Sequence, residues 1–193
     1  MHRMWKGFAA AAFVAVTAST AQAQMGFGLH AGAAMPTGDL GDLAGMGFQV
    51  GGELGFNPAT LPVGIRFDVD FTRFGLDVEG FDVDGNLRIL SGAANAILKI
   101  PATSISPYLV GGLGIYNSQI NIDDVEDDAE AETDFGIQIG GGLGFNLSGF
   151  ETAIELKLVN VFAEESARFF PITFRIMFGG AGDTTGGGGM RRK

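Results

Sequence analysis

Few residues of this 193-residue chain have side chains of the types that perform catalysis. The chain has no cysteine, which excludes a thiol nucleophile, disulfide bonds and a zinc ribbon. After residue 23 the only histidine is His30. A serine hydrolase would need a serine and a carboxylate within hydrogen-bond reach of this histidine, and Ser91 and Asp70 have the required types. No spacing in the sequence brings the three together, so we expect His30 to form hydrogen bonds without a catalytic role.

Acidic and Gly-rich segments are the other patterns that could bind a ligand. Residues 123–134 hold eight acidic residues in twelve positions, and carboxylate oxygens suit Ca²⁺. This segment lacks the glycine and the fixed spacing of a calcium loop, so we expect a solvated loop; whether it binds divalent cations stays open. The glycines of 111–114 and 140–144 lack the Lys-Ser/Thr that a phosphate loop requires. We therefore predict no cofactor and no metal centre.

Composition narrows the class of protein further. The 12 basic residues are outnumbered by 22 acidic ones, which gives a net charge of −10. A nucleic-acid binder would show a basic stripe, so nucleic acid is not an expected partner. The 32 glycines are interleaved with Val, Ile, Leu and Phe, a mixture that is too apolar for a disordered chain.

The N-terminus, residues 1–23, has the features of a secretory signal peptide. Arg3 and Lys6 precede the short apolar stretch of residues 7–18, and Ala21-Gln22-Ala23 supplies the small residues of a cleavage site. The apolar stretch is too short for a membrane-spanning helix, which needs about 20 residues. We expect cleavage after Ala23; the loss of two of the 12 bases and none of the 22 acids changes the net charge from −10 to −12.

Alternation of apolar residues with polar residues or glycine divides the rest of the chain into strands. A period of two gives a strand one apolar face and one polar face. In one segment both faces are apolar or glycine, so its facing is not assigned, and in another Ile97 interrupts the polar face. We predict eight strands of about ten residues, at 27–33, 48–56, 63–71, 90–98, 107–117 (the unassigned one), 135–145, 150–158 and 170–178.

The connections between these segments alternate in length. Short periplasmic turns and longer outer loops are typical of transmembrane β-barrels, whose tilted strands of about ten residues cross the bilayer. We therefore predict an all-β fold, an eight-stranded antiparallel up-and-down transmembrane barrel with both termini on the periplasmic side. The short connections are 57–62, 101–106 and 147–149, and the longer, mostly acidic ones are about 36–45, 75–86, 118–133 and 162–169.

The direction of the apolar face distinguishes this barrel from a soluble one. A soluble eight-stranded barrel would turn its apolar face inward, and the many phenylalanines would then crowd a narrow lumen. With the apolar face toward lipid, glycines and a few charged side chains fill the lumen, and this is the arrangement we predict. Buried charges persist when they are paired. The predicted lumen network is nearly balanced: Glu53, Asp68, Asp70, Glu151 and Glu155 with Arg66, Lys99, Lys157 and Arg175.

A hairpin centred on residues 59 and 60 predicts one specific pair. This register sets Glu53 opposite Arg66 in the lumen, and on the lipid side it sets Phe67 over Gly52. We therefore predict a salt bridge between Glu53 and Arg66.

These features together resemble a known family. The signal peptide, the eight alternating segments, the Pro-Tyr-x-x-Gly-Gly-x-Gly stretch of 107–114 and the closing segment that ends on Phe178 are similar to the small OmpA/OmpX-like outer-membrane barrels of Gram-negative bacteria. The resemblance covers residues 24–178. It implies a place in the bacterial outer membrane, in contact with lipid and lipopolysaccharide, and recognition of a C-terminal aromatic, here Phe178, by the outer-membrane assembly machinery.

The end of the chain departs from this family pattern. The recognised aromatic is usually the last residue of the family, whereas here residues 179–193 follow it. Their glycine content predicts a flexible periplasmic tail, whose role the sequence does not identify.

The expected role is that of a monomeric, non-enzymatic barrel that stabilises the outer membrane or contacts outside partners through its acidic loops. Two alternatives stay open, a narrow pore for small solutes and an outer-membrane lipid-modifying enzyme. The sequence identifies no ligand for the loops.

Overall fold

The computed structural model describes residues 23–58, 63–76, 85–101, 105–122, 131–147, 150–163 and 166–178. Residues 1–22 of the predicted signal peptide and the predicted tail at 179–193 lie outside the described residues, as do most of the acidic positions of 123–134. Within the described part of the chain, no helix is both long and apolar enough to cross a membrane.

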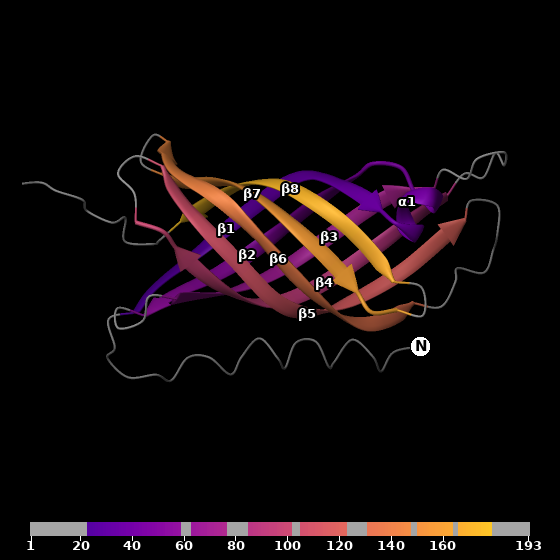
Figure 1. Cartoon of the computed structure of the whole chain (residues 1–193), viewed down its shortest axis with the longest axis horizontal. Helices are drawn as coiled ribbons and strands as arrows, with labels where there is room; N and C mark the ends of the chain where they lie inside the picture. Colours follow the sequence, from indigo (N-terminus) through magenta and orange to yellow (C-terminus); the bar gives the residue numbers. More distant parts are fainter. Residues whose placement is uncertain are drawn as a thin grey trace, which may run out of the picture.

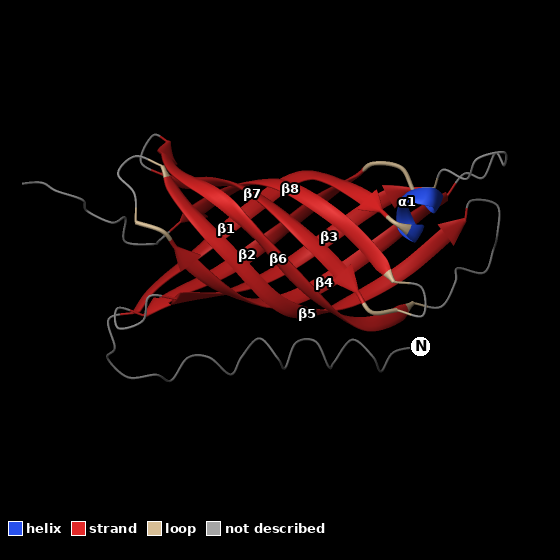
Figure 2. Cartoon of the chain, viewed as in Figure 1, coloured by secondary structure: helices blue, strands red, loops and turns tan. Residues whose placement is uncertain are grey.

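Eight antiparallel strands form one closed barrel, in which each strand pairs with its neighbours in the chain and β1 pairs with β8 (Figure 1). The strands tilt steeply across the barrel wall (Figure 2). Every predicted segment lies within a strand, which confirms the predicted fold class. The strands are β1 (Ala23–Thr37), β2 (Gly47–Pro58), β3 (Val63–Gly75), β4 (Gly85–Lys99), β5 (Ser106–Ile122), β6 (Glu132–Leu147), β7 (Phe150–Val161) and β8 (Ala167–Phe178).

The strands are longer than the alternation predicted, with lengths from 12 to 17 residues instead of about ten. Much of the added length lies toward the long connections, since β4 begins at Gly85 and β5 continues to Ile122. In several added segments the apolar residues point into the lumen, as Phe74, Leu87 and Phe169 do. A pattern that expects apolar residues only on the outer face therefore ends before the strands do. The first long connection also contains a short helix, α1 (Asp39–Leu43), which the sequence did not predict; it lies at one end of the barrel (Figure 2).

The apolar face of the barrel is on the outside, as predicted. Leu54, Val69 and Ile139 are each more than half exposed, on β2, β3 and β6. In β5, which the sequence left unassigned, Tyr108 and Tyr116 are buried and the leucines and isoleucine beside them are exposed. Tyrosine hydroxyls require hydrogen-bond partners, and these are available in the lumen but not in the hydrocarbon.

The predicted register of the first short hairpin is wrong by two residues. In the structure Glu53 is paired with Asp68, and Arg66 is paired with Gly55. The strands β2 and β3 are separated by four residues, 59–62, whereas the prediction assumed a turn of two. Because side chains alternate with a period of two, a shift of two residues leaves every side chain on its predicted face.

Candidate functional site

A layer of buried charged side chains crosses the lumen. Each of its members is at most 6% exposed, and the alternation of its strand turns each one inward. The layer combines four carboxylates, three bases and a histidine from five strands: Glu53, Asp68, Asp70, Glu155, Arg66, Lys157, Arg175 and His30. The structure thus brings together seven of the nine charged residues predicted for the lumen network, and it adds His30.

Glu155 on β7 is the acceptor for several donors in this layer. Arg66 makes a bidentate contact, from Nη1 to Oε2 and from Nη2 to Oε1, each at 2.8 Å. The Tyr108 hydroxyl donates to Oε2 at 2.8 Å, and Arg175 Nη1 donates to Oε1 at 2.6 Å. Asp68 accepts from Arg66 Nε at 2.8 Å on the other side of the guanidinium. Arg66 is therefore held between two carboxylates.

The predicted bridge between Glu53 and Arg66 is not the main pairing of either residue. Arg66 Nε lies 4.0 Å from Glu53 Oε2, and Glu53 is paired with Arg175 Nη2. The register explains the difference, because the two-residue shift places Arg66 beside Gly55, nearer to the short turns than Glu53. Lys157 completes the layer, with Nζ 3.5 Å from Asp68 Oδ2 and 4.0 Å from Asp70 Oδ2.

His30 lies between two carboxylates. Its Nε2 is hydrogen-bonded to Asp70 Oδ1, and its Nδ1 is 3.5 Å from Glu53 Oε2. The His30 ring fits here only because residue 51 is a glycine. A Cβ at Gly51 would lie 2.5 Å from His30 Nε2. Ser91 is the partner of Asp70 across β3 and β4, so the three residue types of a hydrolase do approach one another. Among the described residues, however, Ser91 makes no hydrogen bond with His30, which a serine nucleophile needs.

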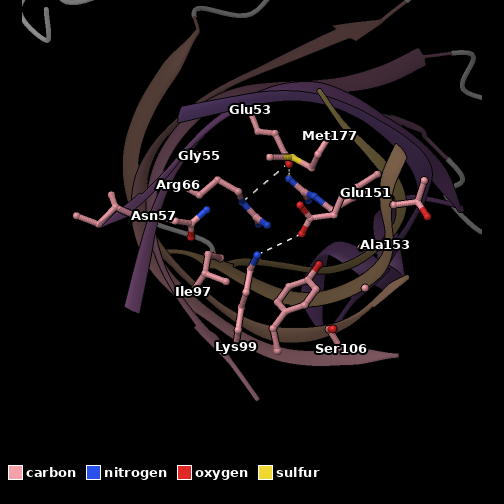
Figure 3. A pocket seen from close by; sticks show the side chains of 16 residues that line it. Glu53, Gly55, Asn57, Arg66, Ile97, Lys99, Ser106, Glu151, Ala153 and Met177 are labelled. Atoms are coloured by element: carbon pink, nitrogen blue, oxygen red, sulfur yellow. Dashed lines mark hydrogen bonds and ion pairs between the residues drawn. The ribbon is translucent and has the colours of Figure 1, made fainter. Parts of the chain in front are cut away.

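The remaining two predicted charges lie outside the buried layer. Lys99 Nζ is 3.2 Å from Glu151 Oε1, and their side chains are 52% and 44% exposed. They line the mouth of a cavity of about 80 Å³ near the short turns, together with Asn57, Ser106 and Met177. Figure 3 shows Arg66 and Lys99 pointing into this cavity, with their contacts to Glu53 and Glu151. Arg66 and Glu53 form part of its inner end.

An apolar cluster fills the lumen on the other side of the charged layer. Phe74 and Phe169 meet edge to face, with ring centroids 5.5 Å apart. Leu40 of α1 packs against this cluster and is 8% exposed. The other buried members are Ala34, Ala44, Leu87, Ile89, Tyr116, Val159 and Val161. From the short turns to the long connections, the lumen therefore holds a cavity, a charged layer and an apolar cluster.

Sequence reasoning missed the neutral polar residues that complete the charged layer. Asn95 Nδ2 donates to Asp68 Oδ2 at 3.1 Å, and Gln138 Nε2 donates to Asn95 Oδ1 at 2.5 Å. Tyr108 and Tyr116 were left without a facing. Their hydroxyls, separated by an even spacing within an otherwise apolar segment, were the signal that could have placed them inside.

Ion pairs and hydrogen bonds dominate this site. His30 is sealed in the layer, away from the lipid side of the wall. In the part of the chain that is described, no three His, Cys, Asp or Glu residues are arranged to hold a metal ion. The contacts are ion pairs and charge-assisted hydrogen bonds, which fix the strands relative to one another.

Phe178, the predicted assembly signal, is the last residue of β8. Its ring stacks on Phe27 at 5.3 Å between centroids and meets Phe150 edge to face at 5.7 Å. The three rings lie at the short-turn end of β1, β7 and β8. Aromatic residues of this kind form the girdles at the membrane interfaces of transmembrane barrels.

A family model described as an outer membrane protein beta-barrel domain matches residues 7–165 of the chain. Among curated proteins, none matches the sequence.

Solved structures share the fold at low sequence identity. Neisserial surface protein A is 18% identical with a TM-score of 0.63, over 81% of this chain and 98% of its own. The outer membrane enzyme PagL is 14% identical with a TM-score of 0.53, over 78% of this chain and 98% of its own. A major outer membrane protein from Thermus thermophilus is 12% identical with a TM-score of 0.50, over 81% of this chain and 100% of its own. These similarities concern the fold and not the activity.

Proposed function

Because the chain belongs to the outer membrane protein beta-barrel domain family and resides in the bacterial outer membrane, we propose that it is a non-enzymatic barrel with a structural or surface-interaction role. It stabilises the membrane as a rigid, filled cylinder, and its acidic outer loops contact partners outside the cell. The protein acts as a monomer in lipid and lipopolysaccharide.

The filled lumen is the observation that supports this proposal. A solute that entered the cavity at the short-turn end would meet a layer whose charged side chains are at most 6% exposed. Separating one partner from a buried ion pair costs about 3 to 5 kcal/mol. Beyond the layer the solute would meet the apolar cluster beneath α1. Both barriers favour a scaffold over a pore.

The position of His30 and Asp70, candidate catalytic groups among the described residues, supports a non-enzymatic role. His30 and Asp70 contact each other inside the charged layer, where they are only 4% and 3% exposed. An enzyme that modifies lipid needs its nucleophile and base on the lipid side of the wall. PagL has a similar fold, but at 14% identity this similarity carries no activity to the present chain.

Planar-bilayer recording tests the proposal against the pore alternative. Wild-type protein refolded in lipid is expected to give no stepwise conductance, because the ion pairs and the apolar cluster block the lumen. The same preparation must contain the folded form, seen as a band that shifts in electrophoresis after heating. Reproducible conductance steps that scale with the amount of folded protein would refute the scaffold role and favour the pore.

Loss of the gene separates the structural role from a purely surface role. We expect the deletion strain to become more sensitive to detergents and to take up large antibiotics faster, and we expect wild-type protein to restore both properties. A variant with the acidic residues of 123–130 changed to their amides should restore the barrier but alter contacts with outside partners. A deletion strain that matches the parent in both barrier and surface contacts would contradict the proposal.

The ends of the chain have processing and assembly roles in this proposal. We propose that residues 1–23 are removed, so that the mass of the purified protein corresponds to a start at Gln24, and that 179–193 form a periplasmic tail. Phe178 is proposed as the residue that the assembly machinery recognises. Phe178→Ala should lower the amount of assembled barrel in cells, whereas Phe174→Ala, on the same strand and face, should leave it near the wild-type amount.

A further inference from the structure

Two arginines lie side by side on the lipid-facing wall, at the end of the long connections. Arg73 of β3 and Arg88 of β4 are direct partners across the ladder, and both side chains are exposed. Like charges directly opposite each other destabilise a sheet. The ion pairs among the described residues are made by other bases. The arginine pair thus concentrates positive charge on this part of the wall.

One of the two guanidinium groups is already positioned. Arg88 Nε donates to Asn86 Oδ1 at 2.8 Å, and among the described residues its two terminal nitrogens make no hydrogen bond. Across the next strand Arg88 is paired with Gln119, a neutral hydrogen-bonding residue. A planar guanidinium with free terminal nitrogens binds phosphate oxygens through two parallel hydrogen bonds.

An apolar hollow lies directly beneath the arginine pair on the same wall. It is lined by Leu29, Val50, Val69, Phe71 and Leu90, with Gly51 and the buried residues His30 and Asp70 at its inner side. Phe71 and Leu90 form the row next to the arginines, and Val69 with Gly92 forms the following row. These two rows are about 7 and 13 Å from the arginines along the strands.

Two glycines leave this part of the wall thin. Gly52 and Gly92 flank Val69 on the lipid side. A Cβ at Gly92 would have no heavy atom within 4 Å, and one at Gly52 would have its nearest at 3.7 Å. The space beside Val69 is therefore open to a chain from outside the protein.

We propose that the arginine pair and the hollow form one binding site for the lipid A part of lipopolysaccharide. A lipid A phosphate lies between Arg73 and Arg88 and screens their repulsion, and one of its acyl chains lies along Phe71 and Leu90 toward Val69. This order of charge and hydrocarbon matches a phosphorylated lipid of the outer leaflet, on the side of the long connections. The inference rests on the orientation in the proposed function, and it specifies a lipid partner for the barrel.

Lipid binding to the refolded full-length barrel in detergent, measured by native mass spectrometry, tests the site. The probe is bisphosphorylated lipid A, compared with dephosphorylated lipid A, phosphatidylglycerol and inorganic phosphate. Loss of two charge-assisted contacts in R73Q/R88Q should weaken lipid A binding about tenfold or more. The matched control R168Q changes a single exposed arginine on β8, which is hydrogen-bonded to Asn160, and should bind like wild type.

The hollow has its own pair of variants. Gly92→Leu fills the space beside Val69 and should weaken lipid A binding several-fold, whereas Gly111→Leu, at another open lipid-facing glycine, should leave it unchanged. Heat-modifiable migration verifies that each variant is folded. The conductance test of the proposed function does not depend on these variants, so the two claims fail separately.

Several results would overturn the site. Lipid A that binds R73Q/R88Q as tightly as wild type would mean that the arginines are neutralised otherwise, for example by carboxylates of 77–84, which lie outside the described residues. Equal binding of dephosphorylated lipid A would show that the phosphate does not contact the arginines. Equal binding of phosphatidylglycerol would show that the site is not specific for lipid A. Displacement of lipid A by inorganic phosphate at the same concentration would show that the acyl chain does not contribute to binding.

Discussion

Glu155 illustrates how one side chain connects several strands of this barrel. From β7 it accepts hydrogen bonds from Arg66 on β3, Tyr108 on β5 and Arg175 on β8. Its carboxylate is fully buried, so each of these bonds forms without competition from water. A residue in this position stabilises the barrel in two ways: it fixes the positions of the side chains around it, and its own charge is paired.

Replacement of Glu155 tests this role. Glu155→Leu leaves Arg66 and Arg175 with fewer counter-ions in a buried place, and we expect the free energy of unfolding to fall by about 3 to 5 kcal/mol. The exposed pair at the cavity mouth gives the control, since Glu151→Gln should change stability by less than about 1 kcal/mol. The fraction of folded band as a function of urea measures both. Equal losses for the two variants would contradict the account.

At this scale the sequence predicts the face of a side chain better than its partners. Alternation placed Glu53, Arg66 and Glu155 inside the barrel. The partner of each residue depends on register and on contacts across the lumen, as between Arg66 and Glu155, which are 89 residues apart. Periodicity within a strand carries no information on such contacts.

At the scale of elements, the glycines of the wall fall into two kinds. A Cβ at Gly140 would lie 2.8 Å from the backbone Cα of Lys157, whereas a Cβ at Gly111 would have its nearest neighbour at 4.0 Å. The first kind permits the close approach of β6 and β7, and the second faces open lipid. The sequence shows both only as glycine.

Alanine at these two positions should therefore have opposite effects. Gly140→Ala forces backbone atoms apart and should destabilise the barrel by about 1 to 3 kcal/mol. Gly111→Ala should be neutral or should stabilise by up to about 1 kcal/mol, because glycine weakens a strand. Urea-dependent gel migration compares them, and a greater loss for Gly111→Ala than for Gly140→Ala would show that the packing of the wall is misassigned.

The register of β2 and β3 can be tested by cross-linking, since the chain has no native cysteine. Leu54 is the partner of Phe67 in the structure. Leu54→Cys with Phe67→Cys should form a disulfide on oxidation, because partners across a ladder have the separation that a disulfide needs. Leu54→Cys with Ile65→Cys, the pair in the register predicted from sequence, should not. Peptide mass analysis distinguishes the outcomes, and preferential formation of the second pair would restore the predicted register.

The short helix α1 closes the lumen through a single side chain. Leu40 is 8% exposed and packs on the apolar cluster, whereas Leu43 on the same helix is 44% exposed. Leu40→Ala should cost about 2 to 5 kcal/mol of unfolding free energy, and Leu43→Ala should cost less than about 1 kcal/mol. Thermal unfolding followed by gel migration tests this difference. Similar midpoints for the two variants would mean that the helix does not seal the barrel.

At the scale of the whole molecule, the sequence predicts the strand number, the closed antiparallel order and the outward apolar face. These follow from patterns within strands of about ten residues. The cavity, the charged layer and the apolar cluster of the lumen do not follow from such patterns. They depend on residues of distant strands that meet only when the barrel closes. Phe74, Leu87 and Phe169, for example, interrupt the expected polar face and gather in the apolar cluster.

In this barrel lipid surrounds the apolar face, and the polar face is sealed inside. Strand β5 offers the sharpest test, because its sequence left the facing open and the only tryptophan of the chain, Trp5, is in the predicted signal peptide. We would place single tryptophans at Leu113, Ile115 and Tyr116 and measure the quenching of their fluorescence by lipids with brominated acyl chains. With lipid on the apolar face, quenching is expected to be strong at 113 and 115 and weak at 116. Strong quenching at 116 with little at 113 and 115 would contradict this arrangement.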